Sequence, residues 1–210
     1  MTAPGKKLAV AGAIIVWLAL ALQFYLIIIN RQASITETIF RYFGFFTILS
    51  NILVAVSFTF IAFNGINKQV GHFFTRPKTL TAVAVYITIV GLIYNTVLRF
   101  LWLPQGWDKV ADEMLHSVIP ACFIFYWLCF VPKQNISWKD IFPWLIYPLV
   151  YLGYSLFRGA FVNWYPYPFI NVTELGYQKV FINSAGVTVA FIVIALLFVG
   201  VAKIMSKRSA

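Results

Sequence analysis

Charged residues are scarce in this sequence. Asp, Glu, Lys and Arg make up only 10% of its 210 residues, while 61% of the residues are hydrophobic. A soluble domain carries about a quarter charged residues and about half apolar ones. A soluble chain of this composition would expose far more apolar surface than water tolerates. The shortage of charge therefore excludes an ordinary soluble domain and favours a membrane protein.

Acidic residues and cysteines are rarer still. Six Asp and Glu stand against sixteen Lys and Arg, which gives a net charge of +10. In a chain this apolar, the basic excess indicates loops that face anionic lipid headgroups, so we expect no nucleic-acid partner. The two cysteines, Cys122 and Cys129, lie in one apolar run. Their separation along a helix is too large for a disulfide, and we expect both to be small core residues.

Long apolar runs predict six transmembrane helices, because about 18 or more such residues can cross the hydrocarbon as a helix. The spans are expected at about residues 8–30, 43–63, 80–101, 113–131, 141–157 and 181–203. The first run continues well beyond the core of a usual signal peptide, so it is predicted to be retained. We therefore expect residues 1–210 to form a single all-α, polytopic membrane domain.

The distribution of Lys and Arg among the loops sets the predicted orientation, because cytoplasmic loops carry more of them. The larger group falls on one side of the spans: Lys6, Lys7, Lys68, Arg76, Lys78, Lys133, Lys139, Lys203, Lys207 and Arg208. The smaller group falls on the other side: Arg31, Arg41, Arg99, Lys109, Arg158 and Lys179. The first side is predicted to be cytoplasmic, and six spans leave both termini there. If the source is bacterial, the membrane is expected to be the inner one.

A set of polar residues lies in or at the ends of the predicted spans, where each is costly and needs a reason. Its members are Thr47, Ser50, Asn51, Asn95, Arg99, Asp112, His116 and Arg158. A rise of ~1.5 Å per residue puts Thr47 and His116 roughly 5–6 Å below the outer ends of their helices. Residues near the outer ends of other spans reach a similar depth from the opposite direction. We therefore expect one polar layer in the outer leaflet.

Three of these residues have the chemistry of a nucleophilic hydrolase. The hydroxyl of Thr47 is a weak nucleophile until a base takes its proton, and His116 is a suitable base near neutral pH. Asp112 lies one helical turn before His116 and could orient its ring. The other histidine, His72, is predicted on the cytoplasmic side, which argues against a haem or zinc site held by both histidines. The hypothesis requires neither a metal nor a cofactor.

The remaining polar residues have possible supporting roles. Asn51, Asn95 or Arg99 could stabilise an oxyanion, and Arg99 or Arg158 could bind a carboxylate of the substrate. Structural explanations stand beside these roles. Asn51 could bond to a neighbouring helix, and the arginines could extend to lipid phosphates. Thr47 could bond to its own helix, and His116 could be an interfacial residue. Spacing alone leaves both kinds of explanation open.

Several segments resemble a known family. They are residues 41–51 (RYFGFFTILSN), Tyr94-Asn95 with Leu98-Arg99, residues 112–120 (DEMLHSVIP), residues 144–149 (WLIYPL), Arg158-Gly159 and residues 165–169 (YPYPF). Together they resemble the bacterial membrane family called Pr6Pr, over about residues 41–176. That family looks related to the eukaryotic androgen-induced and androgen-dependent TFPI-regulating membrane proteins.

The resemblance implies an enzyme. The eukaryotic relatives hydrolyse fatty acid esters of hydroxy fatty acids with a membrane threonine and a histidine, and Thr47 and His116 match those two positions. The substrate would then be a lipid or fatty acid ester held in the membrane. The family pattern leads us to expect Asp where this chain has Asn171. The alternative hypothesis is a membrane lipid-binding or carrier protein without catalysis.

Overall fold

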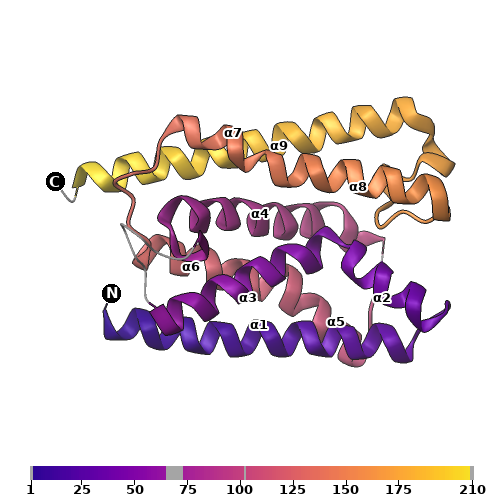
Figure 1. Cartoon of the computed structure of the whole chain (residues 1–210), viewed down its shortest axis with the longest axis horizontal. Coiled ribbons are helices and arrows are strands. Elements are labelled where there is room, and N and C mark those ends of the chain that lie inside the picture. Colours follow the sequence, from indigo (N-terminus) through magenta and orange to yellow (C-terminus); the bar gives the residue numbers. More distant parts are fainter. Residues whose placement is uncertain (1, 65–72, 102, 209–210) are drawn as a thin grey trace.

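The structure is a computed structural model that describes residues 2–64, 73–101 and 103–208. Over these ranges the chain forms helices and no strands, packed side by side in an elongated bundle (Figure 1). This confirms the predicted all-α class. Lys68 and His72, both placed on the cytoplasmic side by the sequence, lie outside the described residues.

The helices follow one another along the bundle. The α-helices are α1 (Ala3–Ile29), α2 (Ile35–Gly44), α3 (Phe46–Asn64), α4 (Pro77–Thr96), α5 (Gly106–Glu113), α6 (Ile119–Phe130), α7 (Ile141–Trp144), α8 (Ile146–Val162) and α9 (Val172–Arg208). A π-helical turn, η3 (Met114–Val118), joins α5 to α6. Short 3₁₀ turns are η1 (Phe73–Thr75), η2 (Leu98–Phe100), η4 (Trp138–Asp140) and η5 (Pro168–Ile170).

Six segments of the described chain are long and apolar enough to cross a membrane, as predicted. They are Ala3–Ile29, Phe46–Phe63, Pro77–Phe100, Gly106–Phe130, Trp138–Val162 and Val172–Lys207. The largest differences from the predicted bounds are at the outer ends of the fourth and sixth spans, which begin at 106 and 172 instead of about 113 and 181. Asp108 lies in the extra turns of the fourth span, and Glu174 lies in a short first turn of α9 that a kink at Gly176 (φ 71°) separates from the rest of that helix. Hydropathy detects only the part of a helix that lies in hydrocarbon, so it misses such ends.

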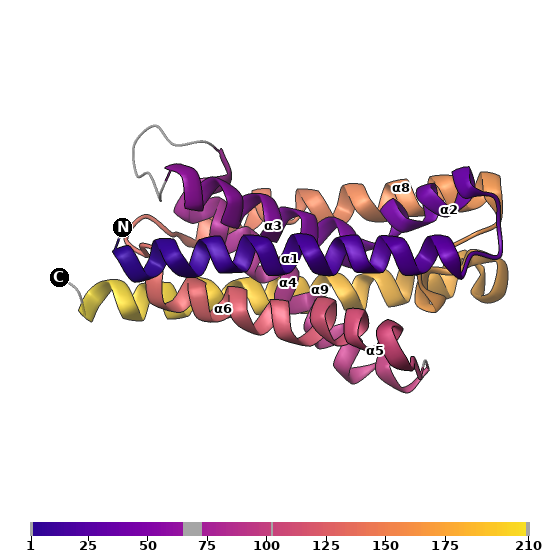
Figure 2. The ribbon, with the colours of Figure 1, turned by 90° about the horizontal axis from the view of Figure 1, so that it is seen from below.

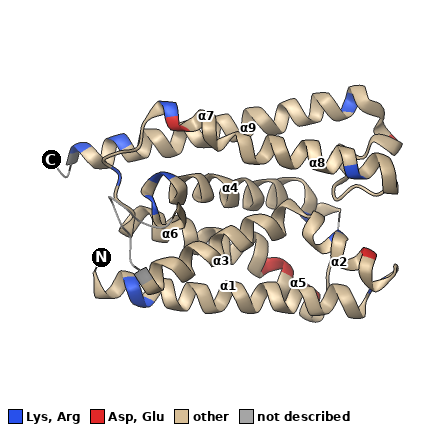
Figure 3. Cartoon of the chain, viewed as in Figure 1, with Lys and Arg blue, Asp and Glu red and all other residues tan. Residues whose placement is uncertain are grey.

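Both termini lie at the same end of the bundle (Figure 1). Lys and Arg gather at this end, whereas most Asp and Glu lie toward the other (Figure 3). Asp140 is the acid at the basic end, and its Oδ1 accepts a hydrogen bond of 2.6 Å from Lys78. The cytoplasmic location of this end stays a prediction from the basic residues, and the opposite end is called the outer end below.

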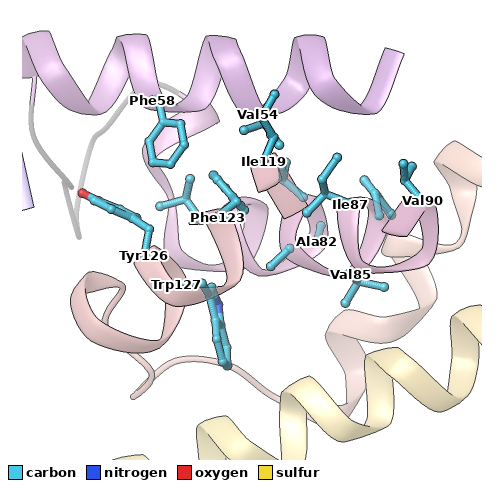
Figure 4. Close-up of a cluster of buried hydrophobic side chains, with 14 of the residues drawn as sticks. Val54, Phe58, Ala82, Val85, Ile87, Val90, Ile119, Phe123, Tyr126 and Trp127 are labelled. Atoms are coloured by element: carbon cyan, nitrogen blue, oxygen red, sulfur yellow. The ribbon is translucent and has the colours of Figure 1, made fainter. Parts of the chain in front are cut away.

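The core lies where α3, α4 and α6 meet (Figure 4). The ring of Phe58 on α3 packs edge-on against Phe123 and Tyr126 of α6, with centroids 5.1 Å apart in both pairs. Trp127 donates a hydrogen bond of 2.9 Å from its indole N–H to Thr81 on α4. This hydrogen bond satisfies a buried indole N–H that hydrocarbon would otherwise leave unpaired, while the Thr81 hydroxyl itself donates to the carbonyl of Pro77 at 2.7 Å.

Small residues on α1 allow it to pack closely against α3. In the view of Figure 2, α1 lies between α3 and α6, and it contacts both. Ala9, Gly12 and Ala13 let α1 approach α3 closely, since a side chain at Gly12 would meet the ring of Phe58 at 2.8 Å.

The two cysteines of α6, Cys122 and Cys129, are exposed on the outside of the bundle. The expectation that they are core residues was wrong, because the face of α6 that carries Phe123 and Trp127 is the buried one.

A break separates α7 from α8 at Leu145. Pro148 has no N–H to donate to the carbonyl of Trp144, four residues earlier. The hydroxyl of Tyr86 on α4 donates to that carbonyl instead, at 2.7 Å. Beyond the break, α8 reaches α3 mainly through aromatic rings, such as the pair Phe46 and Tyr151 with centroids 5.0 Å apart. Side chains rather than close backbone packing hold α8 there, which leaves room for a cavity.

Gly159 offers a stability test of how α8 meets the outer loop. A Cβ at Gly159 would lie 2.0 Å from the ring of Tyr165, whereas a Cβ at Gly153 on the same helix would meet nothing within 4 Å. We predict that Gly159→Ala lowers the free energy of unfolding in detergent by about 1–3 kcal/mol, through overpacking. Gly153→Ala is the control and should leave it unchanged or raise it slightly. Equal melting temperatures for the two variants would contradict this packing.

Candidate functional site

Thr47 lies at the start of α3, immediately after an interruption between the helices α2 and α3. Phe45 adopts an extended conformation (φ −83°, ψ 129°) between α2 and α3, so Thr47 is the second residue of the new helix. Threonines further along helices, such as Thr59 and Thr88, donate to the carbonyl four residues earlier. The Thr47 hydroxyl instead lies 3.3 Å from Nε2 of His116 and 3.3 Å from the hydroxyl of Tyr167. The break thus directs this hydroxyl toward other elements.

His116 lies in the middle of the π-helical turn η3. Pro120 follows four residues later, and in a regular α-helix its ring would collide with the His116 carbonyl and leave that carbonyl without a donor. A π turn widens the helix at this point, and such turns occur frequently at functional sites. The sequence Leu-His-Ser-Val-Ile-Pro therefore gives a local reason for the irregular backbone around this histidine.

The imidazole ring is held on two sides. Its Nδ1 lies 2.9 Å from the carbonyl oxygen of Asp112 and 3.1 Å from the Oδ1 of the same residue. The ring of Tyr94 stacks on it, with centroids 4.0 Å apart and planes 15° from parallel, and the Tyr94 hydroxyl donates to the other carboxylate oxygen of Asp112. Asp112 and Tyr94 thus fix both the position and the tilt of the ring.

These contacts decide which imidazole nitrogen carries the proton in the neutral ring. Both neighbours of Nδ1 are oxygen acceptors, so Nδ1 is the nitrogen that donates. Nε2 then presents its lone pair to the Thr47 hydroxyl, which donates across the 3.3 Å contact. The resulting order of carboxylate, imidazole and hydroxyl is the one found in nucleophilic triads.

Asn51 and Asn95 support the backbone around His116. Asn51 is fully buried, and its amide donates to the carbonyls of Thr47 (2.8 Å) and Leu115 (3.2 Å). Asn95 donates to the carbonyls of Gly91 and His116, at 2.8 and 3.3 Å. Leu115 and His116 lie in η3 shortly before Pro120, which has no N–H to donate, and the asparagine amides donate to their carbonyls. Because both amide hydrogens of Asn51 are used, the oxyanion role suggested by the sequence does not fit its geometry.

Arg99 and Arg158 are held by acidic residues. Arg99 lies 2.7 Å from Glu113, and Arg158 lies 3.0 Å from Glu37. Glu37 also accepts from Arg41, and this hydrogen bond lowers the pKa of the Glu37 carboxyl although burial acts in the opposite direction. Sequence reasoning placed both arginines in the layer of Thr47 and left them free for a substrate carboxylate. It missed these partners because depth along a helix says nothing about the direction in which a side chain points.

Tyr167 is a part of the site that the sequence did not reveal. Its hydroxyl accepts from the backbone N–H of Thr47 at 3.2 Å and lies 3.3 Å from the Thr47 hydroxyl. Tyr167 lies between Pro166 and Pro168 in the loop that joins α8 to α9, and this loop brings the ring back into the bundle. Burial raises the pKa of the Tyr167 hydroxyl, so it stays protonated at neutral pH and can donate a hydrogen bond.

Asn171 caps a helix. Its side-chain oxygen accepts from the backbone N–H of Thr173 at 3.1 Å, and its carbonyl accepts from Leu175 at the start of α9. Asp and Asn serve about equally well at such a position. The Asn in place of the Asp expected from the family pattern therefore keeps this structural role.

A cavity opens beside the Thr47–His116 pair, among α3, α4, α8 and α9. It encloses about 780 Å³ of space between atoms, counting its open mouth. Its walls are mainly apolar side chains such as Ile93, Leu149 and Phe191, and Thr47, His116 and Tyr167 lie on its polar side. Walls of this kind, mainly apolar with a few polar groups on one side, are typical of small-molecule sites. Among the described residues, no three His, Cys, Asp or Glu side chains come together to hold a metal ion.

Comparisons of the chain with protein-family models, curated proteins and solved structures give no match. The resemblance to Pr6Pr stays a prediction from the sequence motifs.

The support that Asn51 gives to the π turn can be tested by stability. Asn51→Leu keeps the approximate volume but leaves the Leu115 carbonyl unpaired, so we predict a loss of about 1–2 kcal/mol in the free energy of unfolding. Thr88→Val is the control, because Thr88 bonds only within its own helix. It should change the free energy by less than about 0.5 kcal/mol. Unfolding in mixed detergent micelles measures both, and an unaffected Asn51→Leu protein would contradict the assignment.

Proposed function

We propose that this protein is an intramembrane hydrolase of lipid esters with Thr47 as nucleophile and His116 as general base. The observation that carries the proposal is the chain of contacts from Asp112 through His116 to the Thr47 hydroxyl, beside an apolar cavity. An apolar cavity alone would suit a lipid carrier equally well. The ordered imidazole within 3.3 Å of a hydroxyl favours catalysis.

In the proposed first step, the Thr47 oxygen attacks the carbonyl carbon of the ester and its proton passes to Nε2 of His116. The Asp112 carboxylate stabilises the imidazolium that forms. The tetrahedral intermediate collapses, the ester C–O bond breaks, and His116 returns the proton to the leaving alcohol. An acyl group then remains on Thr47.

In the second step, water attacks the acyl-threonine while His116 takes one of its protons. Collapse of this second intermediate breaks the bond to Thr47, and His116 returns the proton to the threonine oxygen. The products are a fatty acid and an alcohol. The negative charge of each intermediate forms near the N-terminus of α3, which favours an anion, and near the protonated hydroxyl of Tyr167.

Removal of either member of the pair should abolish turnover. We predict that Thr47→Ala and His116→Ala each reduce the hydrolysis of a long-chain ester in detergent by at least about 10³-fold, since each takes part in the bond-making step. Thr88→Val is the control for a lost helical hydroxyl and should retain full activity. A wild-type protein that retains bound lipid for hours without forming product would favour the carrier hypothesis.

Covalent labelling separates a nucleophile from a structural hydroxyl. A fluorophosphonate probe should label the wild-type protein, and mass spectrometry of the digested protein should place the label on Thr47. Thr47→Ala should lose the label and Thr88→Val should keep it. A label that stays in Thr47→Ala would remove this residue from the mechanism.

Tyr167 should contribute to the rate rather than to the fold. Its hydroxyl is positioned to donate to the oxyanion, so Tyr167→Phe is predicted to lower kcat by about 10–10³-fold with a smaller change in KM. Tyr147→Phe is the matched control, because Tyr147 is an inward-facing tyrosine whose hydroxyl contacts Ser50 and does not line the cavity. It should leave kcat nearly unchanged. Equal effects of the two variants would assign Tyr167 a structural role only.

A further inference from the structure

The cavity beside Thr47 is lined by uncharged groups. Apart from His116, its polar wall consists of hydroxyl groups on threonine, tyrosine and serine residues, and no Lys, Arg, Asp or Glu of the described chain lines it. An ionised carboxylate moved into such surroundings loses its hydration and gains only neutral hydroxyl partners, with no opposite charge to compensate for the lost water. The charge of a ligand is therefore a strong criterion for entry.

The arginines of the outer end do not supply the missing positive charge. Arg99 and Arg158 each form an ion pair, with Glu113 at 2.7 Å and with Glu37 at 3.0 Å. The Arg99 pair is also hydrogen-bonded to Ser117. Arg158 and Arg41 both lie over the ring of Trp164, at 4.9 and 5.3 Å from its centroid. None of these arginines lines the cavity, so a carboxylate inside it would meet no guanidinium.

Ser184 adds a neutral hydrogen-bonding group to the cavity. It lies on α9, it is only 7% exposed, and its hydroxyl has no hydrogen-bond partner in the described structure. A buried hydroxyl without a partner costs free energy unless a ligand or water satisfies it. Ser184 thus offers a hydrogen bond to an uncharged polar group of a ligand inside the cavity.

We propose that the substrate is an uncharged long-chain ester, that Ser184 binds a second, neutral polar group of it, and that esters with a free carboxylate are disfavoured. This inference rests on the proposed hydrolase function. The ionised fatty acid formed by hydrolysis would also be poorly solvated in this cavity. The uncharged walls therefore favour release of the acid product.

A matched pair of substrates tests the charge criterion. One is a fatty acid ester of a hydroxy fatty acid, and the other is its methyl ester, which has the same scissile bond but no charge. Release of the same fatty acid is measured for both, with hydrolysis by alkali in the same micelles as the reference for intrinsic reactivity. The methyl ester should have a kcat/KM at least about tenfold higher. An equal or reversed preference would overturn the proposal while leaving the hydrolase function intact.

Binding to an inactive protein separates the two proposals. Thr47→Ala is incubated with each ester in detergent, and native mass spectrometry measures the fraction of protein that carries it. We expect the methyl ester to occupy the protein at concentrations at least about tenfold lower. If neither ester is ever hydrolysed by the wild-type protein but this preference persists, the hydrolase function fails and the inference about ligand charge stands. Equal binding of both esters would overturn the inference.

Ser184→Ala tests the second polar contact. Loss of one neutral hydrogen bond should raise KM for the methyl ester about three- to tenfold and leave KM unchanged for a simple alkyl ester that has no second polar group. Ser155→Ala is the control, because Ser155 is buried on α8 but does not line the cavity. The same change in KM for both substrates, or in both variants, would show that Ser184 does not bind this group.

Discussion

The contact between the Thr47 hydroxyl and Nε2 of His116 depends on two irregularities of the backbone. The extended Phe45 starts α3 one residue before Thr47, so no carbonyl of a preceding helical turn claims the hydroxyl. The π turn η3 places His116 on a widened stretch of helix whose cause is Pro120. If both helices were regular, the threonine would bond within its own helix as Thr59 does. Their irregularity brings a hydroxyl and an imidazole together at 3.3 Å.

Hydrocarbon imposes a strict condition on such irregular backbone, because carbonyls without donors are costly there. Asn51 and Asn95 meet this condition by donating to the carbonyls of Leu115 and His116. Their polar character is therefore a consequence of the π turn and does not by itself indicate chemistry. The polar groups that remain for a ligand are those that line the cavity. They are chiefly the Thr47–His116 pair and, in addition, the hydroxyls of Tyr167 and Ser184.

The sequence predicted the six spans because membrane thickness fixes the length of an apolar helix. It also predicted that Thr47 and His116 lie at one depth, since rise per residue converts position into height. Height leaves the rotation of each helix undetermined, which is why the partners of Arg99 and Arg158 were missed. The position of Tyr167 inside the bundle depends on a loop with two prolines and on a tertiary contact to Thr47. The hydrophobic periodicity of the sequence does not predict such a contact.

Charged side chains lie at the outer end of the bundle and not in the walls of the cavity. At the outer end, each of Arg99 and Arg158 is paired with a carboxylate. At the candidate site, Asp112 contacts the Nδ1 side of His116 and does not line the cavity. Under the proposed mechanism, a neutral ester enters a neutral cavity, and charge develops only during the reaction. The positive charge then forms on an imidazole that already contacts a carboxylate, and the negative charge forms beside the N-terminus of α3 and Tyr167. Because these partners are in place beforehand, little reorganisation is needed when the charges appear, and this is the condition under which a low dielectric favours catalysis.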